Sequence, residues 1–310
     1  MPIVDAHVHI FPEIHGDIGT GPTRSTGYGR AVIGDEEIQI MPPFNKKTEH
    51  TPEMLIAHMD WAGVDRAMLL QGPFYGVCNQ YVNAAVQAHP DRLMGAVFFD
   101  PWEDGGPDEL YALVDAAAFV ALKIEFTVPS GLCGLHPGAR LDDPKIAWLF
   151  DELERRELIW AIDLGGIEDE SYQTEAVRNI AESHPALRIV IPHLGQPSAK
   201  AIADKTLWRR WQQQVDLALL PNVWHDCAAL PHKFVEEGFP FKSVHRVLCE
   251  AFDRVGAGRI MWGTDIPGLF QVATYPQLVE LGRLHSEFLS PADQLEFLGQ
   301  TAMRVYGGKA

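Results

Sequence analysis

Polar and apolar residues alternate over residues 3–9, and this period of two predicts a β-strand at the start of the chain. Side chains two positions apart leave the same face of a strand, so we expect Asp5, His7 and His9 on one face and apolar residues on the other. Two imidazoles one strand step apart can bind a single ion between them. The alternative interpretation is a pair of surface histidines on an edge strand.

Beyond residue 63, short apolar runs alternate with longer stretches of helical spacing. The apolar runs predict strands at residues 64–70, 93–99, 120–126, 158–164, 187–193, 222–227 and 259–265. The stretches between them predict helices at residues 81–89, 107–117, 144–157, 171–184, 200–219 and 244–255. Two further helices, at residues 275–288 and 291–306, are expected to close the chain.

Strict alternation of strands and helices indicates a parallel sheet, and eight such units favour a closed (β/α)₈ barrel, the TIM barrel of the α/β class. We therefore expect residues 1–310 to form a single domain. A doubly wound open sheet is the alternative. No strand, however, is followed by the glycine-rich phosphate loop that the nucleotide-binding form of that fold needs.

Residues 11–51 interrupt this pattern, because they are rich in Gly, Thr and Pro and show no sustained periodicity. Long connections without regular structure are unusual in compact domains, and many of them form lids or binding loops. The sequence therefore predicts an active-site loop insertion after the first strand, with an insertion of no functional consequence as the alternative. Thr51 and Pro52 then begin a helix that ends at Gly63.

Composition narrows the class of protein. Apolar residues make up 46% of the chain and charged residues 22%, which is enough apolar material for a large core. The net charge of −17 argues against a nucleic-acid surface, since such surfaces need clustered Lys and Arg. The four cysteines form no C-x-x-C pair, so neither a thiolate zinc site nor a disulfide framework is indicated.

The chain shows no signal-peptide pattern and no apolar run of membrane-spanning length. We therefore expect a soluble, cytoplasmic protein in a reducing compartment, with a small-molecule substrate and no nucleic-acid or membrane partner. A homodimer is the default expectation for its assembly.

Potential metal ligands and acid–base groups recur at the carboxyl ends of the predicted strands, where barrel enzymes hold their active sites. In chain order they are His7, His9, Lys123, Glu125, Asp163, His193, His225, Asp226 and Asp265. His225 and Asp226 must point to opposite faces, and the pattern does not decide which of them faces the barrel axis. Imidazoles and carboxylates bind divalent metals of the Zn, Mn or Fe type, and a metal with an open position lowers the pKa of its bound water.

Three segments together resemble the amidohydrolase superfamily: VDAHVH at residues 4–9, IPHLG at 191–195 and MWGTDIP at 261–267. The similarity extends to ALKI at 121–124 and QTAMRVYG at 300–307. The branch that it resembles most includes aminocarboxymuconate-semialdehyde decarboxylase, aromatic-acid decarboxylases and lactone hydrolases. The resemblance implies that His7 and His9 are metal ligands and that Asp265 is a ligand that also moves protons. It implies that His193 is either a ligand or a catalytic group beside the metal.

The chain departs from the family pattern at Asp163, where relatives commonly carry a metal-binding histidine. If Asp163 also binds, two Asp and two His would neutralise a divalent ion, and the harder site would move its preference from Zn toward Mn or Mg. The alternative is that Asp163 contacts a metal ligand or the substrate rather than the metal, and the lactonase resemblance also allows a metal-free site. Lys123 is expected to pair with Asp5, Glu125 or Asp163 or to face a substrate carboxylate, rather than to bridge two metals as a carboxylated lysine.

The function that follows is a metal-dependent hydrolase with one divalent ion, Zn before Mn or Mg, acting on a small ester, lactone or amide. Asp265 and His193 are its expected catalytic groups, and Lys123, Glu125 and His225 are candidate site contacts. The main alternative is non-oxidative decarboxylation of an aromatic or unsaturated acid at the same site. A barrel that binds a ligand without catalysis is the third interpretation.

Overall fold

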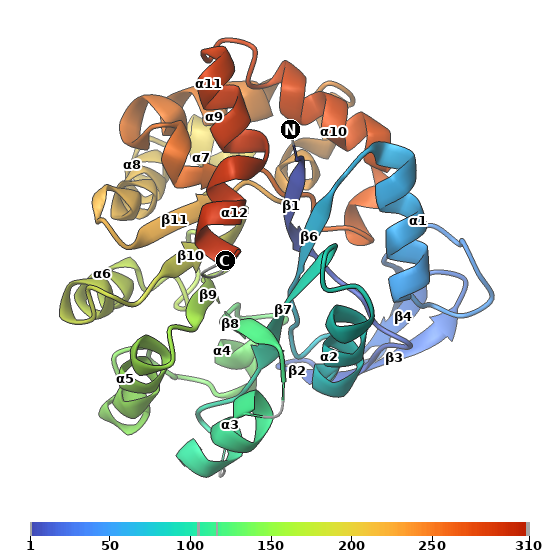
Figure 1. Ribbon diagram of the computed structural model, residues 1–310, viewed down its shortest axis with the longest axis vertical. Helices are drawn as coiled ribbons and strands as arrows, with labels where there is room; N and C mark the ends of the chain where they lie inside the picture. The colour runs from blue at the N-terminus through green and yellow to red at the C-terminus, as the bar shows by residue number, and fades with distance from the viewer. Residues whose placement is uncertain (1, 104–105, 116, 308–310) are drawn as a thin grey trace.

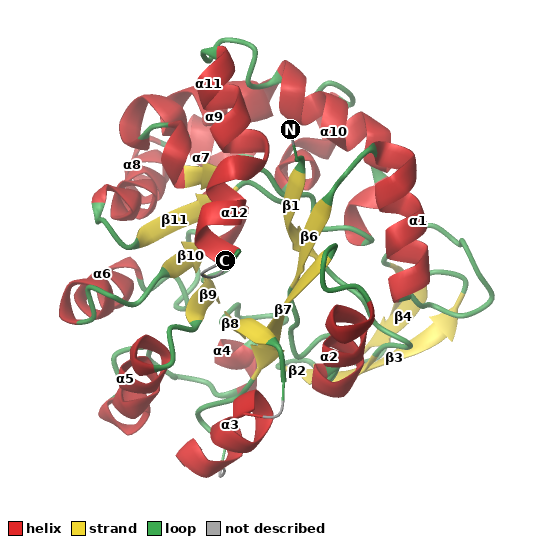
Figure 2. Ribbon diagram, in the orientation of Figure 1, coloured by secondary structure: helices red, strands yellow, loops and turns green. Residues whose placement is uncertain are grey.

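The computed structural model describes residues 2–103, 106–115 and 117–307. Its central element is an eight-stranded parallel sheet in the order β1-β6-β7-β8-β9-β10-β11-β12, with helices around it (Figures 1 and 2). The strands are β1 (Val4–Val8), β6 (Arg66–Leu69), β7 (Leu93–Phe98), β8 (Phe119–Glu125), β9 (Ile159–Asp163), β10 (Ile189–Ile191), β11 (Val223–Asp226) and β12 (Ile260–Met261). The predicted (β/α)₈ barrel is confirmed, and each predicted strand overlaps an observed one.

The helices form a ring outside the strands (Figure 2). They are α1 (Pro52–Ala62), α2 (Asn79–Ala88), α3 (Gly106–Asp115), α4 (Leu132–Leu135), α5 (Ala147–Arg155), α6 (Thr174–Ser183), α7 (Ala199–Ala203), α8 (Lys205–Val215), α9 (Lys242–Val255), α10 (Tyr275–Leu284), α11 (Pro291–Leu295) and α12 (Thr301–Tyr306). Short helical turns lie at η1 (Pro144–Ile146), η2 (Pro192–Gly195), η3 (Asp216–Leu219), η4 (Leu230–Glu237), η5 (Ala257–Arg259), η6 (Gly268–Gln271) and η7 (Glu296–Gln300). Among the helices of the described residues, none combines the length and the apolar character that crossing a membrane requires.

The barrel is filled at one end and open at the other. Small and medium apolar side chains of the strands, such as Val4, Ala6 and Ala121, pack inside the ring against Tyr306 of α12. Helix α12 lies across this end of the barrel in Figure 1. The space for a ligand is therefore left at the carboxyl ends of the strands.

The ring closes between β1 and the residues that follow β12. The N–H of Ala6 donates to the Trp262 carbonyl at 3.0 Å, and the N–H of Asp265 donates to the His7 carbonyl at 2.8 Å. Asp5 reinforces this joint, because its carboxylate accepts hydrogen bonds from the Thr264 N–H at 2.9 Å and the Tyr275 hydroxyl at 2.8 Å. The closure brings the first and last strands of the chain into contact.

The side chains of β1 do not alternate between the two faces of the strand as expected over residues 3–9. The pairing of β1 with β6 shifts register between Asp5 and Val8. Val4 and Ala6 pack inside the barrel and Val8 packs outside it. The Asp5 carboxylate points back to Thr264 and Tyr275, so it does not share a face with His7 and His9. A register shift of this kind re-aims side chains, as a β-bulge does, and a strict period of two does not anticipate it.

Residues 11–51, expected to be an irregular loop, contain a four-stranded antiparallel sheet in the order β2-β3-β4-β5. Its strands are β2 (His15–Ile18), β3 (Gly21–Gly27), β4 (Arg30–Ile33) and β5 (Glu36–Gln39). The turns between strands use glycines in the left-handed region, including Gly29 at φ 75° and Gly34 at φ 59°. Because few side chains of this sheet are buried, and all those of β5 are exposed, the segment lacks the apolar alternation that would have revealed its strands.

Candidate metal centre and catalytic cavity

The imidazoles of His7 and His9 converge at the carboxyl end of β1, where their Nε2 atoms lie 3.2 Å apart. Each ring is also fixed through its other nitrogen, Nδ1. His7 Nδ1 lies 3.1 Å from Asp226 Oδ2, and His9 Nδ1 lies 2.9 Å from the Leu70 carbonyl oxygen. Because these partners accept hydrogen bonds, they favour the tautomer of each ring that carries its proton on Nδ1 and presents the Nε2 lone pair to the other ring.

Asp265 completes the group from the segment after β12. Its Oδ1 lies 2.9 Å from His9 Nε2 and 3.7 Å from His7 Nε2. Its backbone sits at φ 72°, a conformation that non-glycine residues rarely adopt. Such strain persists where the surrounding structure holds it, here by the backbone hydrogen bond to His7, and it is often found at functional sites.

Three acceptor atoms therefore face one another, namely two neutral imidazole nitrogens and a carboxylate oxygen. Lone pairs at these distances repel unless a cation stands between them. Two histidines and a carboxylate are a ligand set that Zn²⁺ accepts, and their ligand atoms all lie within 4.8 Å of one another. The residues present thus fit a divalent metal.

His193 lies beside this group in a left-handed turn, at φ 58°. Its ring centroid is 4.7 Å from that of His7. Its Nδ1 lies 3.1 Å from the Ala228 carbonyl oxygen, and its Nε2 lies 3.3 Å from Asp163 Oδ2. Both ring nitrogens face acceptors, so the ring is arranged as an imidazolium.

The charges of His193 and Asp163 depend on each other. Burial opposes the charged imidazolium, but attraction to Asp163 outweighs it and raises the pKa of His193 to about 9. Burial likewise opposes the Asp163 carboxylate, yet attraction to His193 lowers its pKa well below the usual range. The structure thus places Asp163 against His193 and outside the two groups of potential metal ligands found among the described residues. Its role as a metal ligand stays a prediction.

Asp226 faces the barrel interior and His225 faces away from it. The Asp226 carboxylate accepts hydrogen bonds from the backbone N–H groups of His193 and Ala228, each at 3.0 Å, in addition to that from His7. His225, given above as a candidate contact, instead places Nε2 3.3 Å from the Val215 carbonyl oxygen among the helices. A period of two predicts that neighbouring side chains point to opposite faces, but it does not predict which of them points inward. The orientations of His225 and Asp226 could therefore not be assigned from the sequence.

These side chains open onto a cavity of about 270 Å³. Besides His7, His9, Asp163, His193 and Asp265, its walls are formed by Phe74, Tyr75, Lys123, Glu125 and Ser130. Lys123 and Glu125 were candidate contacts from the sequence, and both face the cavity. Tyr75 and Ser130 were not anticipated, because they lie on loops whose folding the sequence pattern does not specify.

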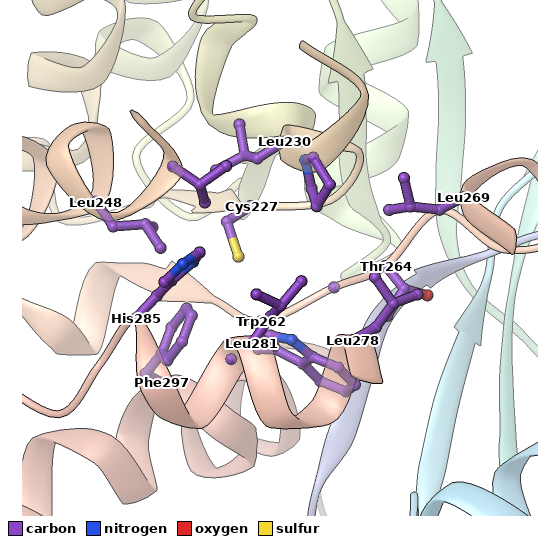
Figure 3. Close-up of a pocket in the computed structure, with 14 residues that line it drawn as sticks. Cys227, Leu230, Leu248, Trp262, Thr264, Leu269, Leu278, Leu281, His285 and Phe297 are labelled. Carbon is purple, nitrogen blue, oxygen red and sulfur yellow. The ribbon is translucent and has the colours of Figure 1, made fainter. Parts of the chain in front are cut away.

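A second cavity lies between β12 and α10 and has a different character (Figure 3). It encloses only about 30 Å³ and is lined mainly by apolar groups, including Leu281 and Phe297. Cys227 points its sulfur into this space, and burial raises the pKa of the thiol well above its usual value. The space is enough for about one water molecule, so we assign the chemistry to the larger cavity.

Nearly the whole chain matches a known protein family. Residues 4–308 match the family described as Amidohydrolase. An L-fucono-1,5-lactonase from Burkholderia multivorans is 28% identical over 141 residues, which are 43% of this chain and 48% of the lactonase. The match therefore spans about half the length of that curated relative.

Solved structures share the fold over nearly all of the chain. An amidohydrolase from Burkholderia multivorans with bound zinc has a TM-score of 0.73 at 17% identity and covers 99% of both chains. A probable 2-pyrone-4,6-dicarboxylic acid hydrolase from Acinetobacter baumannii with bound citric acid has a TM-score of 0.70 at 20% identity, over 99% of this chain and 100% of that one. A 2,6-dihydroxybenzoate decarboxylase has a TM-score of 0.62 at 16% identity, over 84% of this chain and 89% of that one.

Proposed function

This chain belongs to the amidohydrolase family, and from that premise we propose that it is a metal-dependent hydrolase that opens the ring of a small lactone. The observation that carries the proposal is the convergence of His7 Nε2, His9 Nε2 and Asp265 Oδ1, three acceptors that need a cation between them. The partial match to a lactonase supports a lactone as the substrate.

His7, His9 and Asp265 would hold the ion, and we propose Zn²⁺ because two imidazoles and a carboxylate suit it. The zinc in the Burkholderia structure supports that choice. When bound, such an ion supplies Lewis acidity, which lowers the pKa of a water and polarises a carbonyl. The reason for expecting Mn or Mg was a second carboxylate ligand, and the contact of Asp163 with His193 weakens that reason.

Asp265 is the proposed proton carrier. Its side chain is 22% exposed, so it reaches the cavity while remaining tied to His9. Burial opposes its charge, but the surrounding imidazoles, that of His9 first and then those of His7 and His193, hold its pKa below the usual value. The carboxylate therefore accepts a proton from the water that attacks the lactone carbonyl carbon. When the ring C–O bond breaks, Asp265 returns that proton to the departing alkoxide oxygen, and the product is a hydroxy acid.

His193 is the proposed electrostatic partner of the carbonyl oxygen. As an imidazolium whose ring contacts Asp163 and the Ala228 carbonyl, and whose backbone N–H is bound by Asp226, it is oriented before the substrate arrives. A positive charge already in place beside the developing negative charge lowers the barrier without reorganisation. Asp163 and Asp226 act through His193 and His7 rather than on the substrate.

Hydrolysis is tested by combining metal analysis with isotope labelling. The purified protein is assayed for bound metal and then incubated in H₂¹⁸O with a set of five- and six-membered lactones. We expect zinc to copurify and one ¹⁸O atom to appear in the product carboxylate. Carbon dioxide released from a 2,6-dihydroxybenzoate-type acid, with no lactone consumed, would instead support the decarboxylase alternative that the neighbouring decarboxylase structure motivates.

A further inference from the structure

Lys123 is a buried cation that faces the catalytic cavity from strand β8. Its side chain is 1% exposed, and it lines the same space as His7 and Asp265. Among the residues that the structure describes, its ammonium group has no ion-pair partner within 4.0 Å and no hydrogen bond, and Glu125 and Asp163 attract it from a longer distance. A buried ammonium needs hydrogen-bond acceptors, so this group is available to a molecule in the cavity.

The surroundings of Lys123 already carry negative charge. Glu125 lies two residues further along β8, and it pairs in register with Asp163 of β9. Carboxylates directly opposite each other on neighbouring strands repel, and burial raises the pKa of Glu125 while the attraction of Lys123 for both carboxylates opposes these effects. A substrate carboxylate placed against Lys123 would therefore meet two resident carboxylates.

Glu125 is fixed as an acceptor beside the cation. Its Oε1 accepts a hydrogen bond from Ser130 Oγ at 3.1 Å. Its Oε2 lies only 2.1 Å from where a side-chain carbon at Gly72 would stand, so the glycine makes room for this carboxylate. A donor and an acceptor thus lie side by side in the wall of the cavity.

We propose that Lys123 and Glu125 are specificity residues that bind hydroxyl groups of the substrate, which is an uncharged, polyhydroxylated lactone. A hydroxyl accepts from the ammonium and donates to the carboxylate, which neither a carboxylate nor an unsubstituted ring carbon does. This inference rests on the proposed lactone hydrolysis and adds the class of lactone. It separates the substrate from dicarboxylates such as those named for the Acinetobacter neighbour.

Rates with matched substrates test the proposal. The values of kcat/KM are measured for D-glucono-1,5-lactone, for unsubstituted δ-valerolactone and for a six-membered lactone with a ring carboxylate. The wild type should prefer the hydroxylated ring over both others. In Lys123→Met and Glu125→Gln, the kcat/KM for the hydroxylated lactone divided by that for the unsubstituted lactone should fall about 10- to 100-fold. Loss of a hydrogen bond to a charged group has an effect of this size. Lys200→Met, at an exposed lysine, is the matched control and should keep the wild-type ratio.

Two outcomes overturn the proposal. A ratio that stays at the wild-type value in Lys123→Met and Glu125→Gln would make Lys123 only a counterion for Glu125 and Asp163. A wild-type preference for the carboxylated ring would reverse the inferred charge of the substrate. Glu125→Gln changes no volume, so it answers the question even if Lys123→Met fails to fold.

A binding measurement separates this inference from the proposed reaction. 1,5-Anhydroglucitol, a ring polyol without a carbonyl, is titrated calorimetrically into the wild type and both variants. Binding that Lys123→Met weakens at least tenfold supports the inference even if no lactone is hydrolysed, in which case only the proposed reaction fails. Hydrolysis of δ-valerolactone that depends on Asp265, with no gain from ring hydroxyls and no polyol binding, leaves the reaction standing and removes the inference.

Discussion

The two ends of the catalytic cavity are built on different principles. At the proposed metal end, formed by His7, His9 and Asp265, the ligand atoms are acceptors, and each imidazole is fixed through Nδ1 by a further partner. At the proposed recognition end, formed by Lys123, Glu125 and Ser130, a donor and an acceptor lie together and their charges balance. The first arrangement is incomplete without a cation, whereas the second is complete without one. Removing a group should therefore affect metal binding and turnover at one end, and substrate choice at the other.

The largest effect is expected for Asp265→Asn, which acts at the proposed metal end. The variant keeps the shape of the side chain but removes the group that accepts and returns the proton, so we expect kcat to fall by about 10²- to 10⁴-fold. The effect should be of similar size for every lactone, because it acts on the reaction and not on recognition. Steady-state kinetics on hydroxylated and unsubstituted rings check this, with Asp253→Asn at an exposed position of α9 as the control. A loss confined to the hydroxylated ring would contradict the assignment.

A smaller effect is expected for Asp226→Asn, which touches the metal end only through His7. The carboxylate accepts from His7 and from two backbone N–H groups, so an amide must turn its NH₂ group toward one of these donors. Loss of such an outer partner weakens metal affinity by about 10- to 100-fold. Competition with a chromogenic chelator measures the change. His225→Gln, one residue away and pointing out of the barrel, should leave metal affinity within twofold of wild type, and equal losses in both variants would contradict the role given to Asp226.

The pair formed by His193 and Asp163 joins the two ends, and it predicts a pH dependence of stability. The folded pKa of His193 is raised from 6.5 to about 9, so the folded state binds a proton more tightly than the unfolded state. The stabilisation is therefore full below about pH 6.5 and is lost as the pH rises through about 9. For metal-stripped protein, we expect the free energy of unfolding to fall by on the order of 3 kcal/mol across this range.

Urea unfolding at a series of pH values measures that fall. Asp163→Asn should flatten the curve between pH 6.5 and 9, because the carboxylate that holds the proton on His193 is gone. Asp151→Asn, which removes the partner of His184 in an exposed His–Asp pair, is the matched control and should retain the wild-type slope. Wild-type and Asp163→Asn curves that run parallel would contradict the proposed protonation of His193.

The sequence predicted the barrel and most of the metal end because both rest on short-range regularities. The alternation of strands and helices is periodic, and His7, His9 and Asp265 lie at strand ends that any closed parallel barrel brings to one side. The metal and catalytic roles of these residues stay predictions. The inward direction of Asp226 and the turned carboxylate of Asp5 were not predictable, because each depends on a local register that periodicity alone does not fix.

The sheet of β2 to β5 was also not predictable from the sequence. Its link to the cavity gives the smallest effect that we predict. Thr23 of β3 is 2% exposed, and its hydroxyl donates to the Phe74 carbonyl at 2.6 Å and accepts from the Gly16 N–H at 3.0 Å. These bonds tie the inserted sheet to the segment whose Phe74 and Tyr75 side chains form one wall of the cavity. None of the strands β2 to β5 lines the cavity itself, so we expect the insertion to influence a substrate only through this wall.

Thr23→Val keeps the side-chain shape and leaves those two backbone groups unpaired. One neutral hydrogen bond contributes about 0.5–1.5 kcal/mol, so we expect KM to rise about two- to fivefold with kcat nearly unchanged, and the free energy of unfolding to fall by about 1 kcal/mol. Thr20→Val, at an exposed turn of the same sheet, should change neither quantity. Because the wall borders both ends of the cavity, the rise in KM should be equal for hydroxylated and unsubstituted lactones. A fall in kcat comparable to that of Asp265→Asn would mean that the inserted sheet also positions the metal end.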